Sequence, residues 1–220
     1  MKAVRGVILD VDGTLVDSND AHSHAWVVAL AENGVHVPLE KGRRLIGMGG
    51  DKLLPLVSGL KEDCPQGEQI SKRRGDIFKE KYLASLRAFP GTKDLRLLMR
   101  AKGLRLVVAS SAKSDELKPL LEVCGADEVI EDKTSSDDAD RSKPDPDIVH
   151  AALKKIGLPP AEVVMMGDTP YDIEAATRAG VAVIALRSGG WNDGELAGAL
   201  AVYQDPADFL ARYDTSALAR

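Results

Sequence analysis

The chain of 220 residues carries 29 basic and 34 acidic side chains, and its net charge of −5 argues against a surface that neutralises a nucleic-acid backbone. Hydrophobic residues make up 44% of the sequence, enough for a sizeable core, and the longest apolar runs fall far short of the roughly 20 residues that cross a bilayer. The two cysteines provide no disulfide framework, and the first residues do not resemble a signal peptide. We therefore expect a cytoplasmic protein without nucleic-acid or membrane partners.

The first part of the chain predicts one strand followed by helices. Residues 4–9 form a short apolar run that is typical of a buried strand. Residues 16–88 then offer helical periods at 21–32 and 68–86 but no convincing strand. A proline and a glycine interrupt any helix at 89–92, which we interpret as a hinge. The pattern predicts an all-helical domain inserted at 16–88.

After the hinge, apolar strands alternate with helices that end near glycines, as helices with a left-handed C-cap do. Strands are expected at 104–109, 128–130, 163–166, 181–185 and, more weakly, 201–203. Helices are expected at 93–102, 115–124, 145–156 and 171–179, and residues 134–141 read as a polar loop. Strands that are apolar almost throughout are buried on both faces. The pattern predicts a doubly wound, Rossmann-like α/β core made of residues 1–15 and 89–220.

Two acids two residues apart, Asp10 and Asp12, stand at the end of the first strand, in the string Asp-Val-Asp-Gly-Thr-Leu-Val-Asp-Ser. Ligands of parallel α/β sheets bind outside the carboxyl ends of strands, so both side chains are expected in a cleft. In a bare Asp-x-Asp such acids often only cap the turn, but the full string is far more specific. It resembles the first motif of the haloacid dehalogenase superfamily of phosphatases and phosphomutases.

The resemblance implies that Asp10 is the nucleophile that attacks phosphorus and that Asp12 is the general acid and base. Thr14 belongs to the same motif. A dehalogenating member is expected to lack the second acid, so Asp12 favours phosphoryl over halide chemistry. The helical insertion stands where this family carries a C1 cap, a lid that closes over the site.

Three further segments resemble the family's other motifs, in the family's order. Ser110 and Ser111 follow the strand at 104–109 and match the hydroxyl that binds the phosphoryl group, although such serines often only cap a helix. Lys143, set before Pro-Asp-Pro, matches the family's cation; the alternative is a solvated surface lysine. Asp168 and Asp172 match the Gly-Asp-x-x-x-Asp motif, although they could equally serve the helix start.

An aspartate that attacks a phosphate dianion needs added positive charge, and Mg²⁺ with oxygen ligands supplies it. By the resemblance, its ligands are Asp10, Asp168 and the backbone carbonyl of Asp12, while Asp172 supports the site or binds Lys143. The expected reaction is hydrolysis of a small phosphorylated metabolite, phosphoglycolate-like or a sugar phosphate, through an aspartyl phosphate. The alternatives are a β-phosphoglucomutase-like mutase and a non-catalytic binding protein that retains the fold.

The inserted domain gives weaker indications of the substrate. A glycine-rich segment that includes Gly49, Gly50 and Lys52 could reach the site or could simply connect two helices. Phosphoglycolate phosphatases carry a similar segment, whereas β-phosphoglucomutases have an arginine near the position of Gly50. His22 also occurs in β-phosphoglucomutases near the hinge, and it could instead be structural. We expect a monomer or a weak homodimer.

Overall fold

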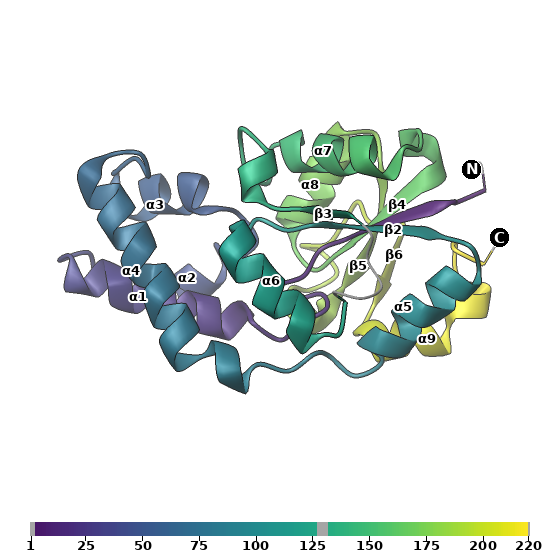
Figure 1. Ribbon diagram of the computed structural model, residues 1–220, viewed down its shortest axis with the longest axis horizontal. Helices are drawn as coiled ribbons and strands as arrows, with labels where there is room; N and C mark the ends of the chain where they lie inside the picture. The colour runs from purple at the N-terminus through teal and green to yellow at the C-terminus, as the bar shows by residue number, and fades with distance from the viewer. Residues whose placement is uncertain (1–2, 127–131, 220) are drawn as a thin grey trace.

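The computed structural model describes residues 3–126 and 132–219. Its centre is a parallel sheet of six strands in the order β3-β2-β1-β4-β5-β6 (Figure 1). The strands are β1 (Gly6–Leu9), β2 (Arg105–Ala109), β3 (Asp132–Thr134), β4 (Val163–Gly167), β5 (Ala182–Leu186) and β6 (Ala201–Tyr203). The predicted doubly wound α/β fold is confirmed. The strand predicted at 128–130 lies outside the described residues.

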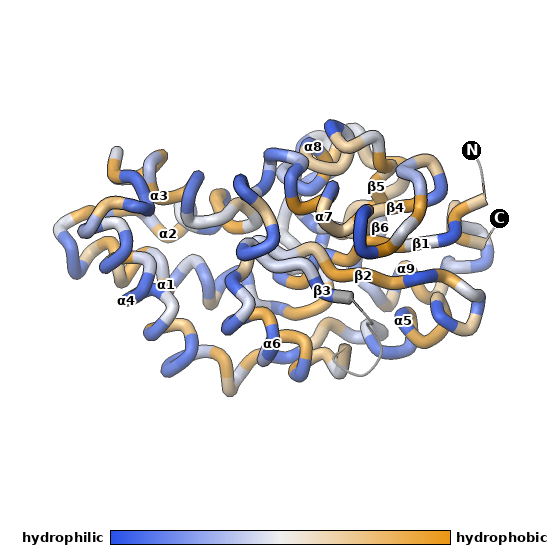
Figure 2. Tube along the Cα trace, turned by 45° about the horizontal axis from the view of Figure 1, so that its top comes forward, coloured by the Kyte–Doolittle hydropathy of each residue, from blue (hydrophilic) through white to orange (hydrophobic). Residues whose placement is uncertain are grey.

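Helices cover both faces of the sheet because its strands are apolar on both sides. In β1, Val7 and Leu9 join one hydrophobic cluster, and Ile8 joins the other, as the alternation of side chains in a strand requires. The first cluster is closed by α5 (Thr92–Ala101), α6 (Ser114–Val123) and α9 (Pro206–Ala211), and the second by α7 (Asp147–Ile156) and α8 (Pro170–Arg178). The hydrophobic residues accordingly gather along the strands in Figure 2.

Four helices of the described residues stand between β1 and α5 in the sequence and lie together beyond the carboxyl ends of the strands, at the end away from both termini (Figure 1). They are α1 (Asn19–Glu32), α2 (Leu39–Arg43), α3 (Gly50–Ser58) and α4 (Pro65–Lys81). The two predicted helices correspond to α1 and α4. The second was predicted too long, because α4 ends at Lys81 and only a single 3₁₀ turn follows at Leu83–Ser85. The sequence did not indicate α2 and α3, which are short and contain Gly42 and Pro55.

The chain enters and leaves this helical part along two adjacent segments. Val16 forms an antiparallel bridge with Ala88, and the backbone N–H of Phe89 donates to the carbonyl of Leu15. Gly91 follows with φ of +78°, a value that favours glycine. The segment at 89–92, predicted as a hinge, therefore begins where the two connecting segments run next to each other.

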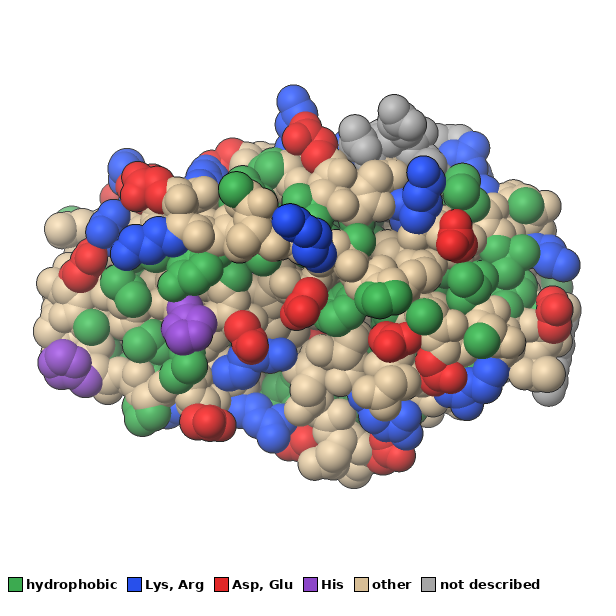
Figure 3. Space-filling model, turned by 90° about the horizontal axis from the view of Figure 1, so that it is seen from below, with side chains coloured by type: hydrophobic (Ala, Val, Ile, Leu, Met, Phe, Trp, Pro, Cys, Tyr) green, Lys and Arg blue, Asp and Glu red, His purple; other side chains and the backbone are tan. Residues whose placement is uncertain are grey.

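The segment predicted as a polar loop at 134–141 is more ordered than expected. Thr134 ends β3 and is buried, and Ser136–Asp138 forms a 3₁₀ turn capped by Ser135. On the surface, acidic and basic side chains are interspersed on the face shown in Figure 3. Among the described residues, no helix combines the length and the apolar character that spanning a membrane requires.

Candidate active site

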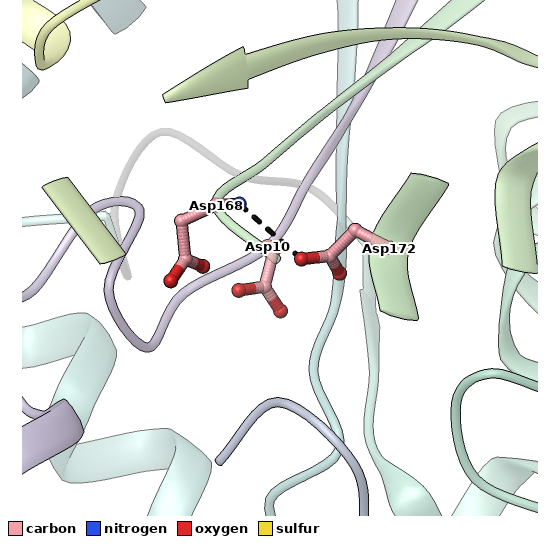
Figure 4. A group of neighbouring side chains, drawn as sticks. All are labelled: Asp10, Asp168 and Asp172. Carbon is pink, nitrogen blue, oxygen red and sulfur yellow. Dashed lines mark hydrogen bonds between the residues drawn. The ribbon is translucent and has the colours of Figure 1, made fainter. Parts of the chain in front are cut away.

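Three buried carboxylates meet where neighbouring strands end. Asp10 follows β1 and Asp168 follows β4, while Asp172 projects back from the first turn of α8. Each offers an oxygen, and these oxygens lie within 4.8 Å of one another. Figure 4 shows the carboxylate of Asp10 between those of Asp168 and Asp172. Because the carboxyl ends of parallel strands share one edge of the sheet, residues that are far apart in the sequence form one cluster.

Lys143 is the counter-charge within this cluster. Its Nζ lies 2.5 Å from Asp10 Oδ1 and 2.8 Å from Asp172 Oδ1, and the residue is 1% exposed. Burial lowers the pKa of Lys143, but the two carboxylates outweigh this effect and raise it above its ordinary value. Three carboxylates against one ammonium leave two negative charges in a buried site.

The pKa values of two carboxyls reflect this excess charge. Burial, together with the charges of Asp172 and Asp12, raises the pKa of Asp10 to about 7 despite the opposing effect of Lys143. Burial and the charges of Asp172 and Asp10 also raise the pKa of Asp168 well above its usual range. The cluster therefore favours either protons or an added cation.

Two neutral side chains orient Asp168. The hydroxyl of Thr14 donates to its Oδ1 at 2.9 Å, and the amide of Asn19 donates to its Oδ2 at 2.9 Å. Gly13 makes room for this arrangement: a Cβ there would lie 2.1 Å from Asn19 Nδ2 and 2.2 Å from Asp168 Oδ2. Asn19 was missed by the sequence analysis, because an asparagine at a helix start reads as an ordinary cap.

Asp12 is not one of the three clustered carboxylates and contacts Ser18 and His22. Its Oδ1 accepts a hydrogen bond from the Ser18 hydroxyl at 2.5 Å and lies 2.8 Å from His22 Nε2. Burial raises the pKa of Asp12, but His22 and Ser18 more than offset this and hold it below its ordinary value. The imidazole of His22 stacks on Phe78 of α4 with 4.0 Å between ring centroids. His22 of the inserted helices is thus in direct contact with a residue of the first motif.

The predicted serines occupy different environments. Ser110 is fully buried, and its Oγ accepts a hydrogen bond from the backbone N–H of Ala112. Ser111 lines the cavity beside Asp10, and its hydroxyl donates to the carbonyl of Gly47 at 3.1 Å.

Asp172 serves two purposes. Its Oδ2 accepts from the backbone N–H groups of Asp168 and Thr169, which makes it the capping-box acid of α8, while Oδ1 faces Lys143. Asp172 thus caps the start of α8 and also pairs with Lys143.

The glycine-rich segment contacts the sheet domain. The N–H of Gly49 donates to Ser142 Oγ at 3.0 Å, and a Cβ on Gly49 would lie 2.6 Å from Ser142 Cβ. Gly50 lines the inner cavity. Lys52 is not among the residues that line this cavity; it pairs with Asp145 at 2.7 Å and lines an outer cleft of about 1270 Å³.

The inner cavity has a volume of about 50 Å³. It joins Asp10 and Asp12 of the sheet domain to residues of the inserted helices. Its other lining residues are His22, Trp26, Ile46, Gly47, Met48, Gly49, Gly50, Arg74, Ser111, Ala112 and Glu116. Arg74 and Glu116, which also line the outer cleft, were not indicated by the sequence, because single charges on amphipathic helices are usually solvated.

The donor set fits a magnesium ion. Carboxylate oxygens of Asp10 and Asp168 converge, and hard cations of this kind prefer oxygen ligands. Oδ1 of Asn19 is buried without a hydrogen-bond partner among the described residues, as expected of an acceptor that faces a bound water. Asp172 already accepts several hydrogen bonds and an ion pair, so Asp10 and Asp168 are the better side-chain ligands.

The fold and the cluster of carboxylates at the carboxyl ends of its strands are those of a class of hydrolases. A family model described as haloacid dehalogenase-like hydrolase matches residues 7–186, and the chain belongs to that family. It is a phosphatase, a phosphoric monoester hydrolase.

Known proteins resemble the chain over most of its length. A phosphoglycolate phosphatase of Rhodospirillum rubrum is 32% identical over 212 residues, which cover 91% of this chain and 87% of that protein. A crystal structure of a hydrolase from Pseudomonas syringae superposes with a TM-score of 0.89 at 33% identity, covering 96% of this chain and 98% of the other. The chloroplastic protein SUPPRESSOR OF QUENCHING 1 of Arabidopsis thaliana is 33% identical over 189 residues, 84% of this chain, but the match spans only 18% of that larger protein.

Proposed function

We propose that this enzyme is a Mg²⁺-dependent phosphatase that hydrolyses a small phosphorylated metabolite, phosphoglycolate-like or a sugar phosphate, through an aspartyl phosphate on Asp10. The observation that carries the proposal is the buried cluster of Asp10, Asp168 and Asp172 with Lys143, beside the pair formed by Asp12 and His22. We expect it to act in the cytoplasm, because the two cysteines of the sequence provide no disulfide framework.

Asp10 is held ready for attack by its neighbours. Lys143 donates to Asp10 Oδ1 at 2.5 Å, which orients the carboxylate, and the Thr14 hydroxyl shared with Asp168 lies 3.3 Å from Asp10 Oδ2. Mg²⁺, held by Asp10, Asp168 and by resemblance the carbonyl of Asp12, would supply the charge that brings a carboxylate and a phosphate dianion together. An Asp10 oxygen forms the bond to phosphorus while the ester P–O bond breaks.

Asp12, assisted by His22, transfers the protons that the two steps of the reaction require. By the resemblance, Asp12 in its protonated form gives its proton to the leaving oxygen, and His22 Nε2, 2.8 Å from Asp12 Oδ1, orients this carboxyl group. In the second half of the reaction, Asp12 accepts a proton from the water that attacks phosphorus. The P–O bond to Asp10 then breaks and phosphate is released.

Residues 16–88 act in this proposal as a cap, and residues 1–15 and 89–220 as the catalytic core. Contacts between the two parts support it: Arg74 of α4 pairs with Glu116 of α6, and Gly49 bonds Ser142. A closed cap excludes water from the cavity, and its opening releases product.

Release of phosphate from p-nitrophenyl phosphate and from a panel of small phosphate esters, at fixed Mg²⁺, tests the proposal. The wild type is expected to hydrolyse some of these esters, and Asp10→Asn is expected to hydrolyse none. Incubation with a hexose 1-phosphate and a trace of bisphosphate distinguishes a mutase from a hydrolase. Formation of the 6-phosphate isomer in place of free phosphate would overturn the proposal of a hydrolase.

A further inference from the structure

Arg74 and Glu116 form a buried ion pair at the joint between the helical part and the sheet. Nη1 of Arg74, on α4, donates to Oε2 of Glu116, on α6, at 2.6 Å. The guanidinium also lies 5.1 Å from the ring centroid of Trp26 on α1. Arg74 is 9% exposed and Glu116 3%. These two contacts hold the guanidinium plane in a fixed orientation.

On one edge of this guanidinium, Nε has no hydrogen-bond acceptor among the described residues. Arg73 and Arg187 each use Nε and Nη2 together to bind both oxygens of one carboxylate, those of Glu32 and Asp193. In Arg74, Nη1 carries the hydrogen bond to Glu116, and Nε is buried without an acceptor in the part of the chain that the structure describes. A buried N–H on a charged group that lacks an acceptor destabilises the fold, so this edge calls for a ligand.

Arg74, which carries this edge, is one of the residues that line the inner cavity beside Asp10. The described side chains that line the cavity include the acids Asp10, Asp12 and Glu116, and Arg74 is the single lysine or arginine among them. The cavity volume of about 50 Å³, compared with about 10–15 Å³ for one water-sized probe, favours a small substrate over a large one. A substrate whose phosphoryl group meets Asp10 shares this cavity with Arg74.

We propose that Arg74 binds a carboxylate of the substrate through its Nε and Nη2 edge, so that the enzyme selects phosphate esters of two- or three-carbon hydroxy acids. This inference rests on the proposed function and adds the substrate class. A planar carboxylate matches the two-point edge of a guanidinium, and a bulkier second phosphoryl group fits the small cavity less well. Glu116 occupies the other side of the guanidinium and leaves that edge free.

Binding of non-hydrolysable ligands tests the subsite without turnover. Calorimetry in the presence of Mg²⁺ compares 3-phosphonopropionate with propylphosphonate, which has a methyl group in place of the carboxylate. We expect the wild type to bind the first about 10- to 100-fold more tightly, the range for a charge-assisted hydrogen bond. Arg74→Gln should abolish this preference, and Arg74→Lys, which keeps the charge but not the two-point geometry, should retain part of it.

The matched control is Arg73→Gln, because Arg73 precedes Arg74 on the same helix but pairs with Glu32 away from the cavity. It should bind both ligands as the wild type does. An unchanged preference in Arg74→Gln, or no preference in the wild type, would overturn the subsite. The subsite would also be overturned if the wild type bound a bisphosphonate more tightly than 3-phosphonopropionate, because the Arg74 edge would then bind a second phosphoryl group.

Turnover separates the subsite from the proposed function. Arg74→Gln is expected to lower the ratio of kcat/KM for phosphoglycolate over ethyl phosphate by about 10- to 100-fold. The subsite would be refuted if the wild type hydrolyses both esters and Arg74→Gln leaves the ratio of their kcat/KM values unchanged. The proposed phosphatase function would not be affected by that result. A wild type that hydrolyses no ester, yet shows the ligand preference and loses it in Arg74→Gln, would refute the phosphatase and support the subsite.

Discussion

The raised pKa of Asp10 predicts that Mg²⁺ stabilises this protein more at pH 8 than at pH 5. Without the metal, the rise in the Asp10 pKa from 3.8 to about 7 corresponds to about 4 kcal/mol. Since the folded state holds the proton more tightly than the unfolded state, this contribution to stability is present below about pH 4 and is lost as the pH rises to about 7. Mg²⁺ binds the ionised carboxylates and should restore the lost stability.

The expected size of the metal effect follows from competition with the proton. Below a pKa of about 7, the apparent affinity of Mg²⁺ falls roughly tenfold per pH unit, thus about 100-fold at pH 5. Mg²⁺ at about 100 times its Kd at pH 8 stabilises the fold by about 2.7 kcal/mol, but the same concentration at pH 5 gives only about 0.4 kcal/mol. For a chain of this size these values correspond to increases in Tm of roughly 5–10 °C and about 1 °C.

Thermal unfolding with and without Mg²⁺ at both pH values measures this difference. Asp10→Asn is the control, because the titrating carboxylate is removed while the four histidines of the chain remain. Its response to Mg²⁺ should be small at both pH values. Equal stabilisation of the wild type by Mg²⁺ at pH 5 and pH 8 would refute the reasoning.

Three further substitutions test single contacts of the site. Asp12→Asn should keep the Mg²⁺-induced increase in Tm and lower kcat by roughly 10²–10⁴, because the carboxylate faces His22 and not the cluster; loss of metal binding would contradict its role. Asn19→Ala should weaken Mg²⁺ about 10- to 100-fold by calorimetry, because Asp168 loses its amide donor, and an unchanged affinity would speak against this. Gly49→Ala should lower kcat/KM about tenfold with little change in Tm, because the new Cβ meets Ser142 at the joint and disfavours the closed cap; wild-type kinetics would show that this contact does not matter.

The sequence predicted most of the sheet and the residues of the cluster. Apolar strands in a parallel sheet bring their carboxyl ends to one edge, so Asp10 and Asp168 could be placed together from their positions after two such runs. Ser110 could be placed after its strand in the same way, but its hydroxyl bonds the backbone of Ala112, a contact that depends on local backbone geometry.

Contacts between the inserted helices and the sheet domain could not be predicted from the sequence. Helices α2 and α3 were missed because five- and nine-residue segments with an internal glycine or proline are too short for a periodic signal. Arg74 and Glu116 are 42 residues apart, and nothing local marks either as buried. Lys52 was considered for the cavity because it lies close to Gly50 in the sequence, yet it lines the outer cleft and its ammonium pairs with Asp145. The partner of each charged side chain depends on how the inserted helices pack against the sheet domain.

The charges around the cavity explain how an enzyme with net charge −5 can take an anionic substrate. Most of its acidic residues are solvated, and salt screens such charges beyond about 8–10 Å. The charges that matter in the proposed function are buried: Lys143 lies beside Asp10, a bound cation would add to its charge, and Arg74 lines the same cavity. A substrate with an anionic group at each end would then meet positive charge at both ends and orient itself for attack by Asp10. On this proposal, substrate selection depends on three buried cations and hardly on the overall charge of the chain.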